Sequence, residues 1–188
     1  MRGIWVLVTG MGEQNASDSI RAAFASRQPR LVMTCGFAGG LTPDLKQGQI
    51  IISTKDARLN ELLTEEGAKS VRFHCAARVA ATAEEKRLLR QETGAEAVEM
   101  ESKAICNICE ENGVPSATVR VVLDEAEQDL PLDFNRVMTG KLEIDYFLLA
   151  IALFRRPRLI PPLLRFQMQA RSAAGRLAEF LARVIARS

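Results

Sequence analysis

Continuous apolar runs recur along the first two thirds of the chain and are separated by polar or glycine-containing segments. Runs of this length between turn signals are typical of buried strands. The predicted strands cover residues 4–8, 31–35, 49–53, 98–100 and 117–123. The first two run into glycines, at Gly10 and at Gly36.

The segments between these runs favour helices. Asn15 or Ser17 is a candidate N-cap for a helix that extends to about Phe24. Residues 84–92 and 101–112 are also helical in character, and Gly113 is a suitable C-terminal cap for the second of them.

Strands that alternate with helices predict an α/β protein with a three-layer, mostly parallel or mixed central sheet flanked by helices. We expect residues 1–145 to form this domain, and residues 146–188 to form a basic, Pro/Arg/Leu-rich helical extension packed on it. In such sheets, ligands bind beyond the carboxyl ends of the strands. The glycine segments, Glu99–Glu101 and Asp124 are predicted to lie there.

Charge is unevenly distributed along the chain and narrows the choice of partners. The 188 residues carry a net charge of +2, yet residues 146–188 hold eight arginines and a single acid, Glu179. This segment therefore has a net charge of +7, which leaves −5 for residues 1–145. An acidic body argues against nucleic acid as the main partner, and the basic segment has to be explained separately.

The cysteines do not form a recognisable metal motif. Cys106 and Cys109 have C-x-x-C spacing, but no second pair accompanies them and His74 is the only histidine. We therefore expect no metal, and reduced thiols packed in a helix and in the sheet. No cofactor is expected either. Because no secretory apolar segment opens the chain, a cytoplasmic location is expected.

Two glycine segments could bring backbone N–H groups close to a ligand. Gly10-Met11-Gly12 lacks the third glycine of a dinucleotide-binding fingerprint, because Asn15 occupies that position, and this disfavours an NAD-binding protein. The segment could also be a bare turn, and Gly36–Gly40 could be only a strand–helix junction.

Three carboxylates lie at predicted strand ends. Glu99 and Glu101 flank Met100, and one of them could accept hydrogen bonds from both hydroxyls of a ribose cis-diol. A solvated pair of charges is the alternative. Asp124 follows seven mostly apolar residues, so partial burial should raise its pKa and let it hold or donate a proton. It could instead cap a helix.

The order of these segments resembles that of a known family. The order begins with T-C-G-F-A-G-G-L and L-K-Q-G-Q-I-I-I, continues with A-V-E-M-E-S-K-A and ends with V-R-V-V-L-D-E-A. This succession is similar to the one in nucleoside phosphorylases and methylthioadenosine/S-adenosylhomocysteine nucleosidases. The resemblance extends from about Val6 to Asp133 and is strongest to hopanoid-associated phosphorylases, through residues 78–86, Asp124-Glu125-Ala126 and the Arg/Pro/Leu-rich tail.

The resemblance implies cleavage of the N-ribosidic bond of a purine nucleoside, of adenosyl type, by a homo-oligomer. It assigns Met100, Glu101 and Met11 to the ribose, with Glu101 on the 2′- and 3′-hydroxyls. It assigns Asp124 to N7 of the base, which this acid would protonate as the base departs. The nucleophile is phosphate, acting as a co-substrate, or water.

The remaining implied positions surround the base and the nucleophile. Phe37, Ala38, Gly39 and Glu99 correspond to that pocket, and Gly10 and Gly12 form a turn on its sugar–phosphate side.

The chain departs from the family pattern where the nucleophile would be held. Phe37 replaces a frequent Ser, and Leu123 stands where Ser commonly precedes the catalytic Asp. The chain also starts at what resembles the family's second strand, so the family's N-terminal strand is missing. A catalytically impaired nucleoside-binding or assembly protein of the same fold is therefore the alternative.

The C-terminal segment permits two interpretations. Tyr146–Phe154 is apolar but far shorter than the roughly 20 residues that span a bilayer. Pro161-Pro162 is predicted to break any helix there. These apolar residues either complete the core or a subunit contact, or residues 159–166, rimmed by arginines, make a peripheral contact with the inner face of an anionic membrane. Residues 177–185 repeat at helical spacing.

Overall fold

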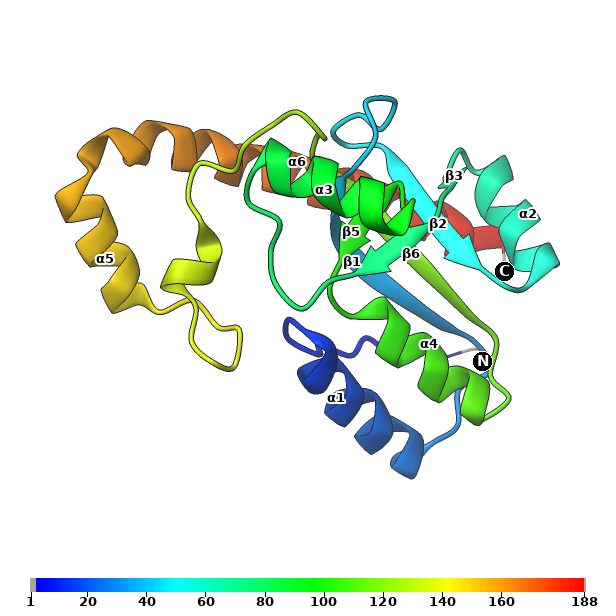
Figure 1. Cartoon of the computed structure of the whole chain (residues 1–188). Coiled ribbons are helices and arrows are strands. Elements are labelled where there is room, and N and C mark those ends of the chain that lie inside the picture. The colour runs from blue at the N-terminus through cyan, green and yellow to red at the C-terminus, as the bar shows by residue number, and fades with distance from the viewer. Residues whose placement is uncertain (1–2, 188) are drawn as a thin grey trace.

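The computed structural model describes residues 3–187, which are organised around a mixed six-stranded sheet with the strand order β3-β2-β6-β1-β5-β4 (Figure 1). Neighbouring strands run parallel in β1/β6, β2/β3 and β4/β5, and antiparallel in β1/β5 and β2/β6. The strands are β1 (Val32–Gly40), β2 (Ile50–Thr54), β3 (Lys69–Ser70), β4 (Phe73–Cys75), β5 (Ala97–Glu99) and β6 (Ser116–Asp124).

Helices cover both faces of this sheet. They are α1 (Glu13–Ser26), α2 (Ala57–Glu65), α3 (Ala83–Thr93), α4 (Ser102–Glu111), α5 (Tyr146–Arg155) and α6 (Ile160–Arg187), with short 3₁₀ helices η1 (Phe134–Val137) and η2 (Pro157–Leu159). The predicted three-layer α/β fold with a mixed central sheet and a C-terminal helix is thus confirmed.

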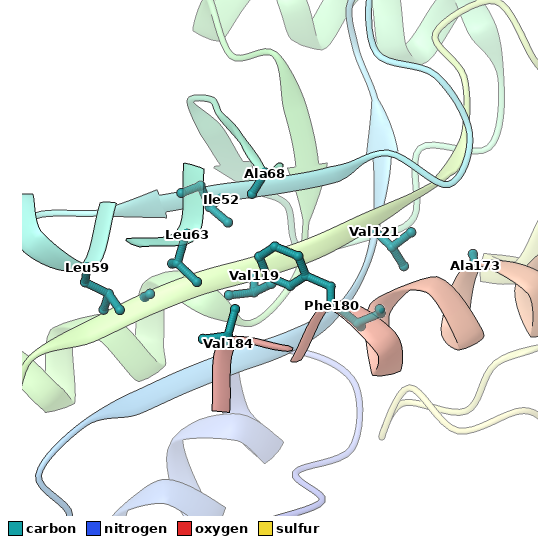
Figure 2. Close-up of a cluster of buried hydrophobic side chains, with 11 residues drawn as sticks. Ile52, Leu59, Leu63, Ala68, Val119, Val121, Ala173, Phe180 and Val184 are labelled. Atoms are coloured by element: carbon teal, nitrogen blue, oxygen red, sulfur yellow. The ribbon is translucent and has the colours of Figure 1, made fainter. Parts of the chain in front are cut away.

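The alternation of side chains along β6 separates the two faces. Ala117, Val119 and Val121 are buried against α2 and α6, in a cluster with Leu63 of α2 and Phe180 of α6. Figure 2 shows the Phe180 ring lying over Val119, with Leu63 beside them. The intervening residues of β6 point to the opposite face.

The opposite face is covered by α4, with α1 packed beside α4 (Figure 1). Cys106 of α4 lies against Thr118 of β6, with 3.7 Å between Sγ and Oγ1. Ile20 of α1 and Ile105 and Ile108 of α4 form a second apolar cluster. The sheet is therefore buried on both faces, which explains its near-continuous apolar strands.

The predicted strand at residues 4–8 is wrong. Residues 3–10 belong to no strand, and the side chains of residues 4–8 are exposed, Val6 by 89%. β1 lies between β5 and β6 inside the sheet, whose edge strands are β3 and β4. Residues 4–8 pair with none of these strands. Apolar composition alone could not reveal this, because a strand also needs a partner for its backbone hydrogen bonds.

The other predicted strands and helices are present with shifted ends. Gly36–Gly40 is not a loop or a junction, because these glycines continue β1 and pair with β6. Neither Asn15 nor Ser17 caps the first helix: Gly12 is its N-cap, with φ of +88°. Asp124 ends β6 and starts no helix.

The C-terminal segment consists of two helices with different environments. α5 buries no residue, whereas α6 buries Ala173, Leu177, Phe180 and Val184 in its second half. Pro161 and Pro162 do not break α6, because they lie in its first turn, where the missing N–H groups have no helical partner to lose. No helix within residues 3–187 is both long and apolar enough to cross a membrane.

The position of Phe180 predicts that the end of α6 is essential for stability. Replacing this buried ring with Ala should lower the free energy of unfolding by about 3–5 kcal/mol, because it removes buried apolar area and leaves a cavity. Urea unfolding followed by circular dichroism measures the change. Ile185→Ala on the same helix is the control, since Ile185 is exposed. An equal loss in both variants would show that α6 is not held by the core contact.

Candidate functional site

A cavity of about 430 Å³ opens at the carboxyl ends of β1, β5 and β6. It brings together nine of the ten sequence-predicted site residues, from four separate segments of the chain. They are Gly10, Met11, Phe37, Ala38, Gly39, Glu99, Met100, Glu101 and Asp124. The tenth, Gly12, does not line the cavity but contacts Glu101 directly.

A buried ion pair lies at the base of this cavity. Arg120, in the middle of β6, is only 1% exposed, and its Nη2 donates to Glu99 Oε2 at 2.7 Å. The same guanidinium donates to the backbone oxygen and the hydroxyl of Thr34 on β1, at 2.7 and 3.1 Å. Burial raises the pKa of Glu99, but Arg120 and the hydrogen bonds from Ser102 outweigh it, and the pKa lies below its ordinary value.

Glu99 is fully engaged by the protein. Its Oε2 also accepts from the backbone N–H groups of Glu101 and Ser102, at 3.0 and 2.8 Å, and its Oε1 accepts from the Ser102 hydroxyl at 2.7 Å. These N–H groups begin α4, where helical backbone leaves them without partners. The carboxylate therefore caps α4 and has little capacity left for a ligand.

Glu101 is the carboxylate with a free oxygen. The backbone N–H of Gly12 donates to its Oε1 at 2.9 Å, while its Oε2 has only the Arg120 Nη2 at 3.6 Å. Burial is the main cause that raises the pKa of Glu101, partly offset by the Gly12 hydrogen bond and by Arg120. A solvated pair of Glu99 and Glu101 is therefore ruled out, and the two residues have different environments.

The turn at Gly12 needs glycine for two reasons. Its φ of +88° is unfavourable for other residues, and a Cβ there would lie 2.3 Å from Leu142 Cδ1. Leu142 belongs to a hairpin closed by the bridge between Met138 and Ile144, and the Asn15 amide donates to the backbone oxygen of Lys141 at 3.0 Å. The hairpin of residues 138–144 thus lies beside the Glu101 end of the cavity, where Met138 and Ile144 line its wall.

Asp124 faces a lysine that has no contact with water. Lys86 of α3 is 0% exposed, and its Nζ lies 2.5 Å from Asp124 Oδ2. The same ammonium donates to the backbone oxygens of Glu125 and Gln128, at 2.8 and 2.7 Å. Burial raises the pKa of Asp124, and the charge of Lys86 and its hydrogen bond oppose this rise without cancelling it.

Local sequence places Lys86 where it can reach Asp124. Thr82 and Glu85 form a capping box that fixes the first turn of α3, so Lys86 points inward one residue later. On the other side of Asp124, β1 and β6 shift register between Ala38 and Gly39, which sets Gly39 opposite Asp124. A Cβ on Gly39 would lie 3.2 Å from Asp124 Oδ2, so a larger residue would crowd the carboxylate.

The rest of the cavity wall is largely apolar. The rings of Phe134 and Phe166 pack at 5.7 Å between centroids and join η1 to α6. Both line the cavity together with Met138, Ile144 and Leu130. The site therefore combines two buried or half-buried carboxylates with an apolar surface that extends toward the C-terminal helices.

Three of the four cysteines offer no activated nucleophile. Burial raises the pKa of Cys35, which lines the cavity, and raises that of Cys75 to about 12 and that of Cys109 to about 11. Over residues 3–187, no group of three or more His, Cys, Asp and Glu side chains is placed to hold a metal ion.

Arg120 and Lys86 were not singled out as site residues from the sequence. A charged residue inside the apolar run of residues 117–123 was a usable signal, because a buried arginine requires a partner. Lys86 gave no comparable signal, since its helix is mostly polar.

Sequence comparisons relate the chain to the phosphorylase superfamily and to nucleosidases. The sequence model of the phosphorylase superfamily matches residues 2–80 and 56–143. A 5′-methylthioadenosine/S-adenosylhomocysteine nucleosidase of Oceanobacillus iheyensis is 23% identical, over 73% of this chain and 75% of that protein. The corresponding nucleosidase of Actinobacillus succinogenes is 26% identical, over 73% and 74%.

Solved structures show the same fold at lower identity. The futalosine hydrolase of Helicobacter pylori superposes with a TM-score of 0.70 at 17% identity, covering 96% of this chain and 78% of that one. A 5′-methylthioadenosine/S-adenosylhomocysteine nucleosidase from Neisseria meningitidis, in complex with methylthio-immucillin-A, gives a TM-score of 0.69 at 18% identity, covering 95% and 78%.

The Glu99–Arg120 pair predicts a defined pH dependence of stability. Because the folded-state pKa of Glu99 is lowered, its contribution is present above the unfolded value of about 4.3 and is lost as the pH falls through the folded value. Arg120→Met should cost about 3–5 kcal/mol at neutral pH, since it leaves a buried carboxylate unpaired. This deficit should shrink in acid, where Glu99 becomes protonated.

Urea titrations at neutral and acidic pH measure both effects. Lys55→Met is the control, because the Lys55–Glu110 pair is exposed and should contribute at most about 1 kcal/mol. If Arg120→Met loses no more stability than this control, the buried pair does not hold the site together.

Proposed function

The chain belongs to the phosphorylase superfamily, and on that premise we propose that it cleaves the N-ribosidic bond of a purine nucleoside. The observation that carries the proposal is the pairing of two carboxylates in one cavity. Asp124 is buried with a raised pKa, and Glu101 keeps one oxygen free of hydrogen bonds from the protein. An acid and a hydroxyl acceptor are the two groups that ribosidic cleavage needs most.

Asp124 supplies the proton in this proposal. Cleavage builds negative charge on the departing base, and protonation at N7 neutralises it. Lys86 contacts Oδ2, which leaves Oδ1 as the oxygen that carries the proton toward the base. Because Lys86 is fixed by three acceptors, it also holds the carboxyl in one orientation, and we assign it a positioning role.

Glu101 binds the sugar. Its Oε2 accepts from the 2′- and 3′-hydroxyls, while Gly12 holds the other oxygen in place. Met100 and Met11 line the cavity and pack against the ribose. Positive charge that develops at C1′ during cleavage is stabilised by the nearby carboxylate, so the site favours the transition state over the ground state.

Water is the nucleophile we favour. The relatives named above are nucleosidases and a hydrolase, and Phe37 cannot offer a hydroxyl to phosphate. Arg120 Nε is buried and has no hydrogen-bond partner within the described residues, so a nucleophilic water would satisfy it. Phosphate as co-substrate is the other outcome of the assay, and the reaction proposed here requires no cofactor.

The apolar wall supports a substrate with an apolar 5′ substituent, such as an adenosyl thioether. Residues 138–144 lie next to Gly12, and therefore at the end of the cavity where Glu101 holds the sugar. Met138 and Ile144 line the cavity there. We further propose that the enzyme works as a homo-oligomer in the cytoplasm, where its four free cysteines stay reduced.

Asp124→Asn tests the chemical step. The variant should fold and bind nucleoside as the wild type does, yet release base about 10²–10⁴-fold more slowly, because it cannot supply the proton. Base release is measured on a panel of purine nucleosides, with and without phosphate. Hydrolysis predicts little stimulation by phosphate. A wild-type chain that binds nucleosides but never turns them over would instead be an impaired binding protein.

Glu101 predicts discrimination between sugars. Ribonucleosides should bind more tightly than 2′-deoxynucleosides, because a half-buried carboxylate loses a partner when one hydroxyl is absent. Glu101→Gln should shrink this preference. Calorimetry measures both affinities, with Glu125→Gln as a control at a carboxylate that pairs with Lys46 away from the cavity. Equal affinities of the wild type for both sugars would refute the assignment.

A further inference from the structure

Residues 146–172 project from the sheet (Figure 1) and touch the rest of the described chain through contacts such as those of α5 with η1 and of Phe166 with Phe134. We call this segment, which comprises α5, η2 and the first half of α6, the basic arm. None of its residues is buried. Large apolar side chains are exposed along it: Tyr146 by 78%, Phe147 by 74%, Leu164 by 56% and Met168 by 62%. Folded proteins rarely expose so many such side chains without a partner.

Four exposed residues of α5 share one face. Tyr146, Phe147, Ala150 and Phe154 follow the i, i+1, i+4, i+8 spacing of a helical stripe, and Phe154 is 90% exposed. Phe147, Ala150, Ile151 and Phe154 also line an open hollow of about 480 Å³, with Arg155 at its side. This face offers an apolar surface with a cation beside it.

The arm is strongly cationic and its charges are free. It contains Arg155, Arg156, Arg158, Arg165 and Arg171 and no acidic residue. None of these five arginines forms an ion pair with a described residue. Further along α6, by contrast, Arg183 and Arg187 pair with Glu65 and Glu66.

The charge of the arm selects among possible partners. A symmetric contact of the arm with the same arm of a second copy would bring five arginines against five arginines, with no acid on either arm to neutralise them. An anionic lipid surface offers what the arm lacks: negative charge for the guanidinium groups and an acyl region for the aromatic side chains. Aromatic and basic residues on adjacent positions are typical of such interfacial helices.

We propose that the basic arm docks the protein reversibly on an anionic phospholipid membrane. The apolar face of α5, with Phe147 and Phe154, enters the boundary between headgroups and acyl chains. Arg155, Arg156 and Arg158, which follow at the bend between α5 and α6, contact the phosphates. This proposal does not depend on the reaction proposed above, because membrane binding is measured without nucleoside.

Docking would bring the cavity close to the membrane. Ile144 lines the cavity, and the Asp145 carboxylate next to it accepts from the N–H groups of Phe147 and Leu148 and so starts α5. Phe166 of α6 also lines the cavity. The arm is therefore connected to the cavity wall at its start, next to Ile144, and again at Phe166.

Sedimentation of the full chain with vesicles tests the proposal. We expect binding to vesicles of phosphatidylcholine with phosphatidylserine, weak binding to phosphatidylcholine alone, and release by high salt. Arg155→Gln/Arg156→Gln/Arg158→Gln should lower the partition coefficient by about 100-fold, as three basic residues near an anionic surface would account for. Phe147→Ser/Phe154→Ser should also lower it.

A matched control separates the arm from overall charge. Arg21→Gln/Arg58→Gln/Arg90→Gln removes the same charge from exposed positions outside the arm and should leave binding unchanged. All these positions are exposed, so circular dichroism should show an unaltered fold. Failure of the wild type to sediment at low salt would overturn the proposal, as would equal losses in the arm and control variants. Self-association that the Phe147→Ser/Phe154→Ser variant abolishes, without vesicle binding, would identify the arm as a subunit contact and overturn it too.

Discussion

Arg120 and Glu99 place a positive and a negative charge inside the sheet, and the arrangement of the site depends on how these two charges are satisfied. Arg120 ties β6 to Thr34 of β1 and to Glu99 at the end of β5. Glu99 in turn accepts from the first N–H groups of α4. One ionic contact thus joins three strands and a helix. Glu101, at the start of α4, is held at the cavity as a consequence, and the cost of burying both charges is offset only while both are present.

Much of the fold could be predicted because buried strands and amphipathic helices leave distinct patterns. The runs at residues 31–35, 49–53 and 117–123 became β1, β2 and β6. The same reasoning failed at residues 4–8, since pairing depends on a neighbouring strand and not on composition. It also failed at Gly36–Gly40, where glycine continues a central strand instead of ending it. The predicted helix break at Pro161 and Pro162 was wrong, because the effect of a proline depends on its position within a helix.

The site was predictable where chemistry follows from residue type, and less so where it follows from packing. Asp124 and Glu101 could be chosen because a carboxylate at a strand end is conspicuous, and burial does raise the pKa of both. Glu99 looked equivalent to Glu101 in sequence, and only the hydrogen bonds at α4 distinguish them. The contact of Lys86 with Asp124 could not be predicted for a further reason. Its partner lies 38 positions away, on an element that no local pattern connects with α3.

The packing of α6 has a consequence for how the chain folds during synthesis. Ile52 of β2 and Phe180 of α6 belong to one apolar cluster but are 128 positions apart. A ribosome that adds about 5–20 residues per second would leave the β2 and β6 side of the sheet without its cover for roughly 6–26 s after Ile52 is made. Ile52 presents bare apolar surface throughout that interval, and Val119 and Val121 do so from the time they are made. Protection of nascent chains by chaperones should therefore matter until residue 184 has emerged, and the sheet can close around its final helix only then.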